Sequence, residues 1–410
     1  MKTLPIAALA LLAGCQQKSQ PSSSLQSGEI PPAASGPQIT AANVTQADRK
    51  LATEIPIGAL ETVALFDGAM PTGVTVSQKG RVFVNFPRWG DTVDFTVGEV
   101  RGGKVTAFPN AEINRVPTGN LDAGFVSVQS VVVDPKDRLW VLDTGSIELK
   151  PSALGGPKLV AIDLETNAVT KTIVLPRNVA LPTSYVNDVR FDLRRGKGGM
   201  AFITDSSTAG PNGIIVVDLD SGRSWRKLHD HPSTNAEKGF LPIVEGKAMM
   251  VREPGKAPKP VTFGSDGIAI SADGKTLYYC PLASRRLYAV STDALANEAL
   301  PDAAVAKTVQ DLGEKGASDG LESDAENRVY VTNYEQNAIL RRNTDGTFET
   351  LVVDPRALWP DTLSLASDGY LYFTANQLER QARFNDGKDL RQKPYALFRV
   401  KTNGTRIRLE

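Results

Sequence analysis

Histidine and cysteine are scarce in this sequence, which has two of each among 410 residues. Two histidines, His229 and His231, are too few for a multi-histidine zinc site, and two cysteines cannot build a disulfide scaffold. An excess of either charge is also missing, because 46 basic side chains balance 46 acidic ones. This balance argues against a strongly basic nucleic-acid-binding protein. Any chemistry must therefore use carboxylates, amides and hydroxyls.

No long hydrophobic run opens the chain either. The apolar stretch from Leu4 to Leu12 is too short to span a bilayer and is typical of a signal peptide. It leads into Leu12-Ala13-Gly14-Cys15, which resembles a bacterial lipobox, where the chain is cut before the cysteine and the thiol is acylated. We expect residues 1–14 to be a lipoprotein signal peptide. An ordinary secretory signal with an incidental cysteine is the alternative.

The acylated Cys15 would anchor an exported protein to the cell envelope. Gln16, rather than Asp, follows it, which resembles the outer-membrane sorting pattern of Gram-negative lipoproteins. Residues 15–50 are rich in Ser, Pro and Gln and lack aromatic side chains, so we expect a disordered tether before a domain at 51–410. With Cys15 acylated, Cys280 has no partner and is expected to be a buried thiol. We expect a monomer.

One sequence motif, here called the phrase, recurs along the predicted domain. It consists of a polar residue, an alternating apolar run, a turn with Asp, Asn or Gly, and a second apolar run. Further strand-like segments lie between the copies, which start about 58 residues apart. No long segment between them has the apolar periodicity of a helix. Four short strands per repeat predict an all-β, six-bladed β-propeller. A pair of β-sandwiches would not explain a single recurring phrase. The six copies span residues 72–85, 129–143, 187–205, 266–280, 319–333 and 361–376.

The two chain ends should share one blade. Residues 61–66 form an apolar-alternating segment before the first phrase and have no blade of their own. The last phrase leaves 395–400 and 405–409 as outer strands of its blade. Pairing 61–66 onto that blade would remove a free sheet edge and close the ring.

Polar residues occupy the two ends of each phrase. In a blade's inner hairpin, the start of strand one and the end of strand two are neighbours, so both sets should gather on one face of the channel. Asp and Asn also cap strands and start turns through local hydrogen bonds, and this remains the alternative for each position. These ligand-binding candidates, here called the polar ring, are Thr72, Asn85, Gln129, Asp143, Asn187, Asp205, Asp266, Asp319, Asn333 and Asp361.

Aromatic residues adjoin several of these positions and could wall a pocket. Trp359 precedes Asp361, Tyr185 and Phe263 precede other ring members, and Trp89 follows one. Carboxylates beneath aromatic walls suit a cationic or aromatic small molecule. Converging carboxylate and amide oxygens equally suit one divalent cation, Ca²⁺ or a similar ion.

Several stretches resemble the Yellow/major royal jelly protein family. They are FPRW at 86–89, RLWVLDTG at 138–145, PKLV at 157–160, SDGIAIS at 265–271 and LYYCPLAS at 277–284. The resemblance covers residues 56–405 and implies a six-bladed propeller. Insect members carry disulfides, which this chain cannot form.

A looser resemblance is to the SMP-30/gluconolactonase/strictosidine-synthase-like propellers. Asn187, Asp266 and Asp319 occupy the places where the lactonases put Asn, Asn and Asp metal ligands. Their fourth ligand is a glutamate, and the matching position here is Thr72. The resemblance thus implies a possible but altered metal site.

Two functions of different classes are compatible with these residues. The first is a small-molecule-binding propeller with the polar ring as its floor. The second is an enzyme: a metal-dependent lactonase or hydrolase, or a Yellow-like dopachrome isomerase, with Asp319 as the base. The missing glutamate at position 72 favours the first. We expect the partners to be the ligand and the membrane, without nucleic acid.

Overall fold

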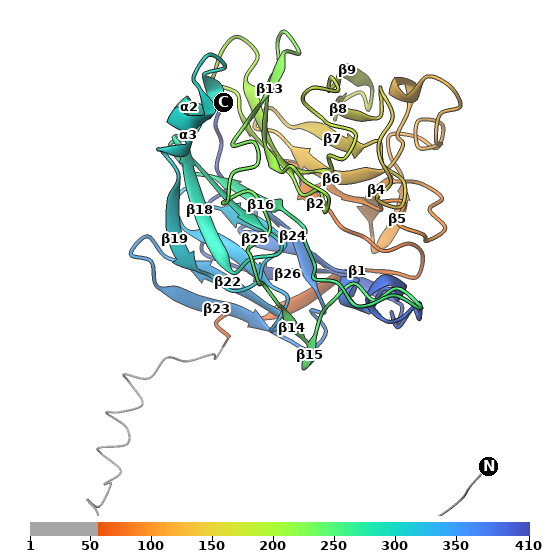
Figure 1. The fold of residues 1–410 in the computed structure, drawn as a ribbon. Helices are drawn as coiled ribbons and strands as arrows, with labels where there is room; N and C mark the ends of the chain where they lie inside the picture. The colour runs from red at the N-terminus through yellow and green to blue at the C-terminus, as the bar shows by residue number, and fades with distance from the viewer. Residues whose placement is uncertain (1–55) are drawn as a thin grey trace, which may run out of the picture. The chain divides into compact units, whose positions relative to one another are not determined.

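In the computed structural model, residues 56–410 are described, and they form six four-stranded antiparallel sheets around one axis (Figure 1). The sequence specifies each inner hairpin through its turn. A residue with positive φ lies in the turn of every blade, for example Gly80, Asp137, Asn327 and Gly369. Gly, Asn and Asp tolerate this left-handed conformation better than other residues. The predicted six-bladed propeller is confirmed, and each repeated phrase forms the inner two strands of a blade.

The strands follow chain order within the first five blades. Blade 1 contains β2 (Val74–Val76), β3 (Val82–Asn85), β4 (Val97–Arg101) and β5 (Lys104–Ala107); blade 2, β6 (Val128–Val133), β7 (Arg138–Thr144), β8 (Pro157–Asp163) and β9 (Val169–Val174); blade 3, β10 (Val186–Asp192), β11 (Met200–Asp205), β12 (Gly213–Asp218) and β13 (Ser224–Lys227); blade 4, β16 (Ser265–Ile270), β17 (Thr276–Pro281), β18 (Arg286–Ser291) and β19 (Gln310–Glu314); blade 5, β20 (Leu321–Ser323), β21 (Val329–Asn333), β22 (Ala338–Arg342) and β23 (Phe348–Val353).

The sixth blade joins both ends of the domain, in the order β24 (Pro360–Leu365), β25 (Tyr370–Ala375), β26 (Tyr395–Lys401) and β1 (Leu60–Phe66). β1 pairs with β26 from Leu60 opposite Val400 to Phe66 opposite Tyr395. The predicted closure is therefore confirmed. The expectation that 405–409 forms an outer strand of this blade is wrong, because that segment leaves the sheet.

Insertions between strands carry the remaining short elements. They are the hairpin β14 (Ile243–Val244) and β15 (Lys247–Ala248), the helices α2 (Thr292–Ala296) and α3 (Asp302–Ala306), and the 3₁₀ turns η1 (Leu121–Ala123), η2 (Leu378–Arg380) and η3 (Ala382–Phe384). Among residues 56–410, none of the helices has the length and apolarity needed to cross a membrane.

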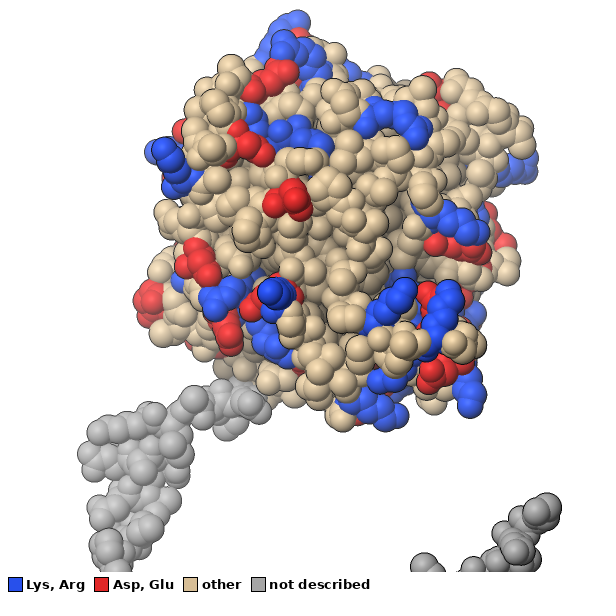
Figure 2. Space-filling view, in the orientation of Figure 1, with Lys and Arg blue, Asp and Glu red and all other residues tan. Residues whose placement is uncertain are grey.

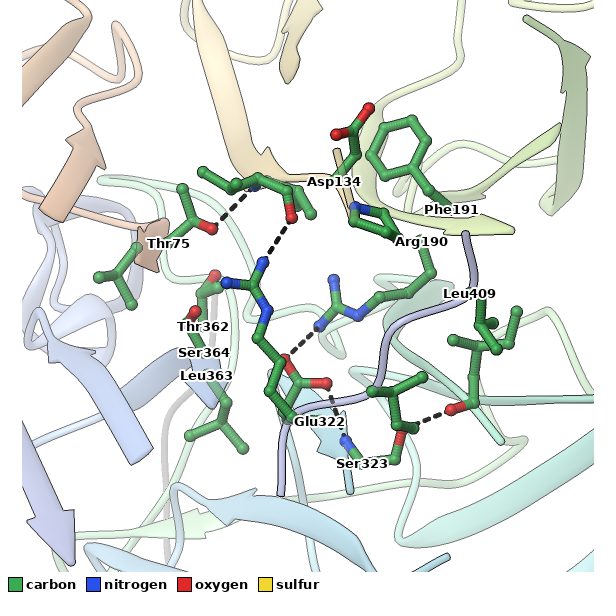
Figure 3. A pocket seen from close by; sticks show the side chains of 17 residues that line it. Thr75, Asp134, Arg190, Phe191, Glu322, Ser323, Thr362, Leu363, Ser364 and Leu409 are labelled. Atoms are coloured by element: carbon green, nitrogen blue, oxygen red, sulfur yellow. Dashed lines mark hydrogen bonds and ion pairs between the residues drawn. The ribbon is translucent and has the colours of Figure 1, made fainter. Parts of the chain in front are cut away.

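The C-terminal strap, residues 403–410, crosses one end of the channel. Its Arg406 donates hydrogen bonds of 2.7 Å to the carbonyls of Val76 in blade 1 and Val133 in blade 2. Farther along, Leu409 accepts from the Leu193 amide of blade 3 at 2.8 Å. Between the strap and the six inner strands lies a cavity of about 70 Å³ (Figure 3). Arg190 and Glu322 approach one another there, with 4.0 Å between nitrogen and oxygen.

The hydrophobic core lies between neighbouring blades. Trp140 of blade 2 stacks on Phe191 of blade 3 with ring centroids 5.3 Å apart, and both are buried. Such contacts repeat around the ring, because each sheet buries both faces. On the face drawn in Figure 2, basic and acidic side chains are interspersed toward the margin and neither sign forms a continuous patch.

Candidate functional site

The inner strands change register where the ring residues stand. In blades 2, 3, 4 and 6 the register between the two inner strands shifts near the start of the first one. The shift falls between the first residue of that strand and the residue two or three positions later. Gln129, Asn187, Asp266 and Asp361 fall inside these shifts. A bulge of this kind redirects a side chain out of the regular alternation. In these four blades the local backbone thus turns the polar side chain at the start of the phrase out of the regular alternation.

The glycine that follows two of the aspartates lets the blades approach closely. A Cβ at Gly267 would lie 2.4 Å from the Asp319 carbonyl oxygen, and one at Gly320 would lie 2.3 Å from that of Asp361. Both distances are below any real Cβ contact, so only glycine fits without backbone movement. The repeated Asp-Gly pair therefore places the carboxylates of blades 4, 5 and 6 near one another.

Three carboxylates meet in this way at the channel: Asp266, Asp319 and Asp361, which are 3%, 5% and 4% exposed. Asn187 Nδ2 donates to Asp266 Oδ2 at 2.7 Å, and Asn376 Nδ2 donates to Asp361 Oδ2 at 2.7 Å. Within residues 56–410, none of the three carboxylates forms an ion pair with Lys, Arg or His. These four ring residues, Asn187 included, are the ones that the structure brings together.

The pKa values of all three carboxyl groups are raised. Burial is the main cause, and the charge of Asp319 adds to the effect on Asp266 and on Asp361, whose pKa values lie well above the ordinary value. The pKa of Asp319 rises to about 6, opposed by the hydrogen bonds from Trp359 and Asp266. Without a cation, shared protons relieve the repulsion.

The acidic residues at the ends of strand two have a different role. Asp143 accepts from the Val126 amide at 2.7 Å and pairs with Lys158 at 2.8 Å, both side chains being fully buried. Asp205 accepts from the Tyr185 amide at 2.9 Å and pairs with Arg226 at 2.8 Å. These carboxylates are strand caps with local cations, as the alternative interpretation held. Their oxygens are engaged, so we no longer expect them to contact a ligand.

The neutral ring members are bonded mainly to their neighbours. Asn85 Nδ2 donates to Thr72 Oγ1 at 2.8 Å, and the Thr72 hydroxyl donates to the Gln129 carbonyl at 3.2 Å. Gln129 Oε1 accepts from the Tyr185 hydroxyl at 3.0 Å. Asn333 Nδ2 donates to Gln336 at 3.0 Å. The contacts of Thr72, Asn85 and Gln129 connect blades 1, 2 and 3, whereas the Asn333 bond stays within blade 5.

The aromatic residues fall into two groups. Trp359 is fully buried, stacks on Tyr334 with centroids 4.0 Å apart, and donates its Nε1 hydrogen to Asp319 at 2.6 Å. It orients a carboxylate and does not wall an open pocket, which corrects the sequence-based expectation. Trp89 and Tyr185 do lie together, and Trp89 Nε1 donates to the Tyr185 hydroxyl at 2.8 Å.

Sequence reasoning missed the residues that cover this face. Residues 377–392, here called the lid segment, contribute Leu378 and Phe384 to an apolar cluster with Trp359 and Phe263. The same segment places Arg383 over the rings of Trp89 and Phe263. The lid segment lies outside the repeat and has no hydrophobic period, so the sequence carried no signal for its position.

The residues of the ring do not fit a calcium site of the expected kind. Asn187 turns its amide nitrogen, not its oxygen, toward Asp266. Within the described part of the chain, no three His, Cys, Asp or Glu side chains are arranged to hold a metal ion. Thr72 is bonded within blades 1 and 2 and supplies no carboxylate. We therefore derive no chemical step through a metal.

The N-terminal predictions lie outside the described residues. These are the signal peptide at 1–14, acylation of Cys15 and the tether at 15–50. Cys280, at the end of β17, is fully buried, as expected. Burial raises the pKa of its thiol, which argues against a nucleophile.

Comparison with known proteins finds similarity to insect proteins. The family model described as "Major royal jelly protein" matches residues 126–403. Major royal jelly protein 7 of Apis mellifera is 28% identical over 174 residues, which cover 42% of this chain and 36% of that protein. Protein yellow of Drosophila melanogaster is 27% identical over 240 residues, covering 56% of this chain and 42% of that protein. The chain thus spans less than half the length of these relatives.

Solved structures show the same architecture at low identity. A protein from Agrobacterium tumefaciens described as calcium-binding regucalcin has a TM-score of 0.51 and 17% identity, covering 88% of this chain and all of that one. A luciferin-regenerating enzyme has a TM-score of 0.51 and 13% identity, covering 86% of this chain and 99% of that one. At such identity these likenesses show the propeller fold alone.

Proposed function

The chain belongs to the major royal jelly protein family, and from the site on its propeller we propose that it binds a small molecule whose cationic group contacts Asp266, Asp319 and Asp361. The observation that carries this proposal is the lack of an ion-pair partner for these three carboxylates among residues 56–410. The other buried acidic residues of the ring, Asp143 and Asp205, each have one.

The energetic argument is one of charge balance. Burying an unpaired carboxylate costs several kcal/mol unless it takes up a proton or meets a cation, and here three are adjacent. The neighbouring charges do not supply the cation: Arg190 is paired with Asp188 at 3.1 Å, and Lys315 Nζ donates to the Gly316 carbonyl at 3.0 Å. An amine that entered the channel would replace the shared protons and stabilise the folded protein.

Titration calorimetry with benzylamine, an aromatic monocation, tests the proposal. Binding to the native protein should tighten as the pH rises from about 5 to about 7, because Asp319, with a pKa of about 6, ionises in that interval and only the ionised form attracts the amine. Benzyl alcohol, which has the same ring without the charge, is the matched control and should bind at least about tenfold more weakly at pH 7.

Two results would contradict the cationic ligand. Equal binding of benzyl alcohol and benzylamine would show that the ligand binds only through apolar contacts of its benzene ring and that the carboxylates do not attract its amine. Tight binding of Ca²⁺ that excludes benzylamine would favour the metal-dependent alternative.

That alternative, a lactonase or hydrolase, or a dopachrome-type isomerase, uses Asp319 as a general base. A pKa of about 6 suits such a role, since a base works best near the working pH. Against it stand Thr72 in place of the glutamate that is the fourth ligand of the lactonases, and the amide nitrogen that Asn187 turns toward Asp266. Binding without turnover is therefore the function that the geometry supports best.

We further propose that the mature protein begins at acylated Cys15 and is anchored to the cell envelope, in the outer membrane. Replacing Cys15 by Ser removes the acylated thiol, so the variant should appear in the soluble periplasmic fraction while the native protein sediments with membranes. Cell fractionation followed by immunoblotting measures this. A serine variant that still sediments would contradict the lipobox interpretation.

A further inference from the structure

Arg383 of the lid segment is a half-buried cation whose side chain has no hydrogen-bond or ion-pair partner within residues 56–410. Its Nε and Nη2 atoms are closed off from water and unpaired. These two nitrogens lie on the same edge of the guanidinium and present two parallel N–H donors. This edge matches the two oxygens of a carboxylate.

The other charges around Arg383 are already neutralised. Arg383 lines a pocket of about 300 Å³ together with Glu148, Asp389 and Arg391. Glu148 pairs with Lys150 at 2.6 Å. Arg391 pairs with Asp389 at 2.6 Å and with Asp91 at 2.8 Å. Arg383 is therefore the one lining charge for which the described residues provide no counter-ion.

Aromatic rings surround the guanidinium. Its carbon Cζ lies 4.8 Å from the ring centre of Phe384, 5.5 Å from that of Phe263 and 5.6 Å from that of Trp89. Cation–π contacts offset part of the desolvation cost, but they satisfy no N–H group. Burial lowers the pKa of Arg383 to about 10, so the side chain keeps its charge at neutral pH.

Tyr185 connects this position to the channel. Its pKa is raised mainly by burial, and it responds to the charges of both Arg383 and Asp266. Trp89, whose ring packs against the Arg383 guanidinium, donates to the Tyr185 hydroxyl at 2.8 Å, and Asn187, two residues after Tyr185, donates to Asp266 at 2.7 Å. These contacts lead from the unpaired cation of the lid segment to the unpaired carboxylates of the channel. A molecule with a charge of each sign at its two ends would complement both.

We infer that Arg383 binds the carboxylate of a small aromatic molecule at the channel mouth. The planar carboxylate accepts from Nε and Nη2, and the ring of the ligand packs among Trp89, Phe263 and Phe384. Because the two donors are closed to water, the lid segment must shift as the ligand enters. The inference rests on the proposed function only where it assigns the cationic end of the same ligand to the channel.

Thermal-shift and calorimetric titrations with benzoate, an aromatic carboxylate without a cationic group, test Arg383 alone. The native protein should bind benzoate, and Arg383→Met should raise the Kd at least tenfold, which is about 1.4 kcal/mol. Arg383→Lys keeps the charge but lacks the two-donor edge, so its affinity should fall between them. Sulfate should bind more weakly than benzoate, since it has no ring to pack among the aromatics.

Arg380→Met is the matched control. Arg380 lies three residues away in the same segment and is paired with Glu245, so its loss should leave benzoate binding unchanged. Hydrogen exchange supplies a second readout: benzoate should protect the amides of 377–392 in the native protein and in Arg380→Met, but not in Arg383→Met.

The inference is overturned if the native protein shows no benzoate-dependent shift, or if Arg383→Met binds benzoate as tightly as the native protein does. Stronger binding of sulfate than of benzoate would also contradict it, because the site would then be a general anion site. Failure of the proposed cationic site would appear separately, as loss of benzylamine binding with benzoate binding intact.

Discussion

Replacing Asp319 by Asn is expected to weaken benzylamine binding by at least tenfold, about 1.4 kcal/mol, without destabilising the ligand-free protein. The variant keeps the shape of the side chain, and its amide oxygen can still accept the Trp359 hydrogen. It removes one of three adjacent buried carboxylates, so the repulsion in the ligand-free state falls. Calorimetry measures the affinity, and chemical denaturation measures the free energy of unfolding.

The effect on stability should depend on pH, with a sign set by the raised pKa of Asp319. This pKa is about 6 in the folded protein and about 4 in an unfolded chain. The folded protein holds the proton more tightly, so the free energy of unfolding of the native protein falls as the pH rises from about 4 to about 6. The stability advantage of Asp319→Asn should be absent near pH 4 and complete above about pH 6, where it reaches at most about 3 kcal/mol.

Asp324→Asn in the same blade is the matched control. Asp324 is fully buried but accepts from Arg328 Nε at 2.7 Å and from the Tyr330 hydroxyl at 2.7 Å. Its loss should lower stability and leave benzylamine affinity unchanged. If Asp319→Asn behaves like this control instead, Asp319 is a strand cap and the proposed binding site is wrong.

Deleting residues 56–66 should abolish cooperative unfolding, because it removes the whole outer strand of blade 6. The deletion exposes the edge of β26 and takes Phe66, which is 3% exposed and packs edge-on against Phe86 at 5.5 Å. Truncating such a ring alone costs about 3–5 kcal/mol, a large part of the total stability of a typical domain. Differential scanning calorimetry records the transition.

Deletion of residues 16–40 is the comparison for that experiment. The sequence places this stretch in the tether, so the melting transition should be unchanged. Phe66→Ala provides a milder variant that keeps β1 and should lower the melting temperature while the transition stays cooperative. Equal melting of the two deletion proteins would contradict the role of β1 in closing the ring.

The fold could be predicted because each blade repeats its own local signals. Alternating apolar residues and a turn residue that tolerates positive φ, such as Asp137 or Asn327, recur in every copy. The unpaired segment at 61–66 then indicated how the ring closes. The segment at 405–409 was assigned wrongly, because its apolar residues pack across the channel end and not along a sheet edge.

The site was predicted in outline only. Asp and Asn stand at both ends of the phrase, and the sequence pattern cannot separate a carboxylate that faces the axis from one that caps a strand. The separation depends on partners from other strands, as Lys158 for Asp143 and Arg226 for Asp205 illustrate. Arg383 could not be found at all, since its position is fixed by packing of an irregular insertion and not by any repeat.

The strap at residues 403–410 closes one end of the channel along the propeller axis. Hydrogen bonds of Arg406 attach the strap to blades 1 and 2, and a hydrogen bond to the Leu409 carbonyl attaches it to blade 3. Because the strap covers this end, we expect a molecule bound at the three carboxylates to enter and leave at the opposite end, beside the lid segment. Association and dissociation of the ligand then both require the lid segment to move. The residence time of the ligand therefore depends on the lid segment as well as on the contacts at the carboxylates.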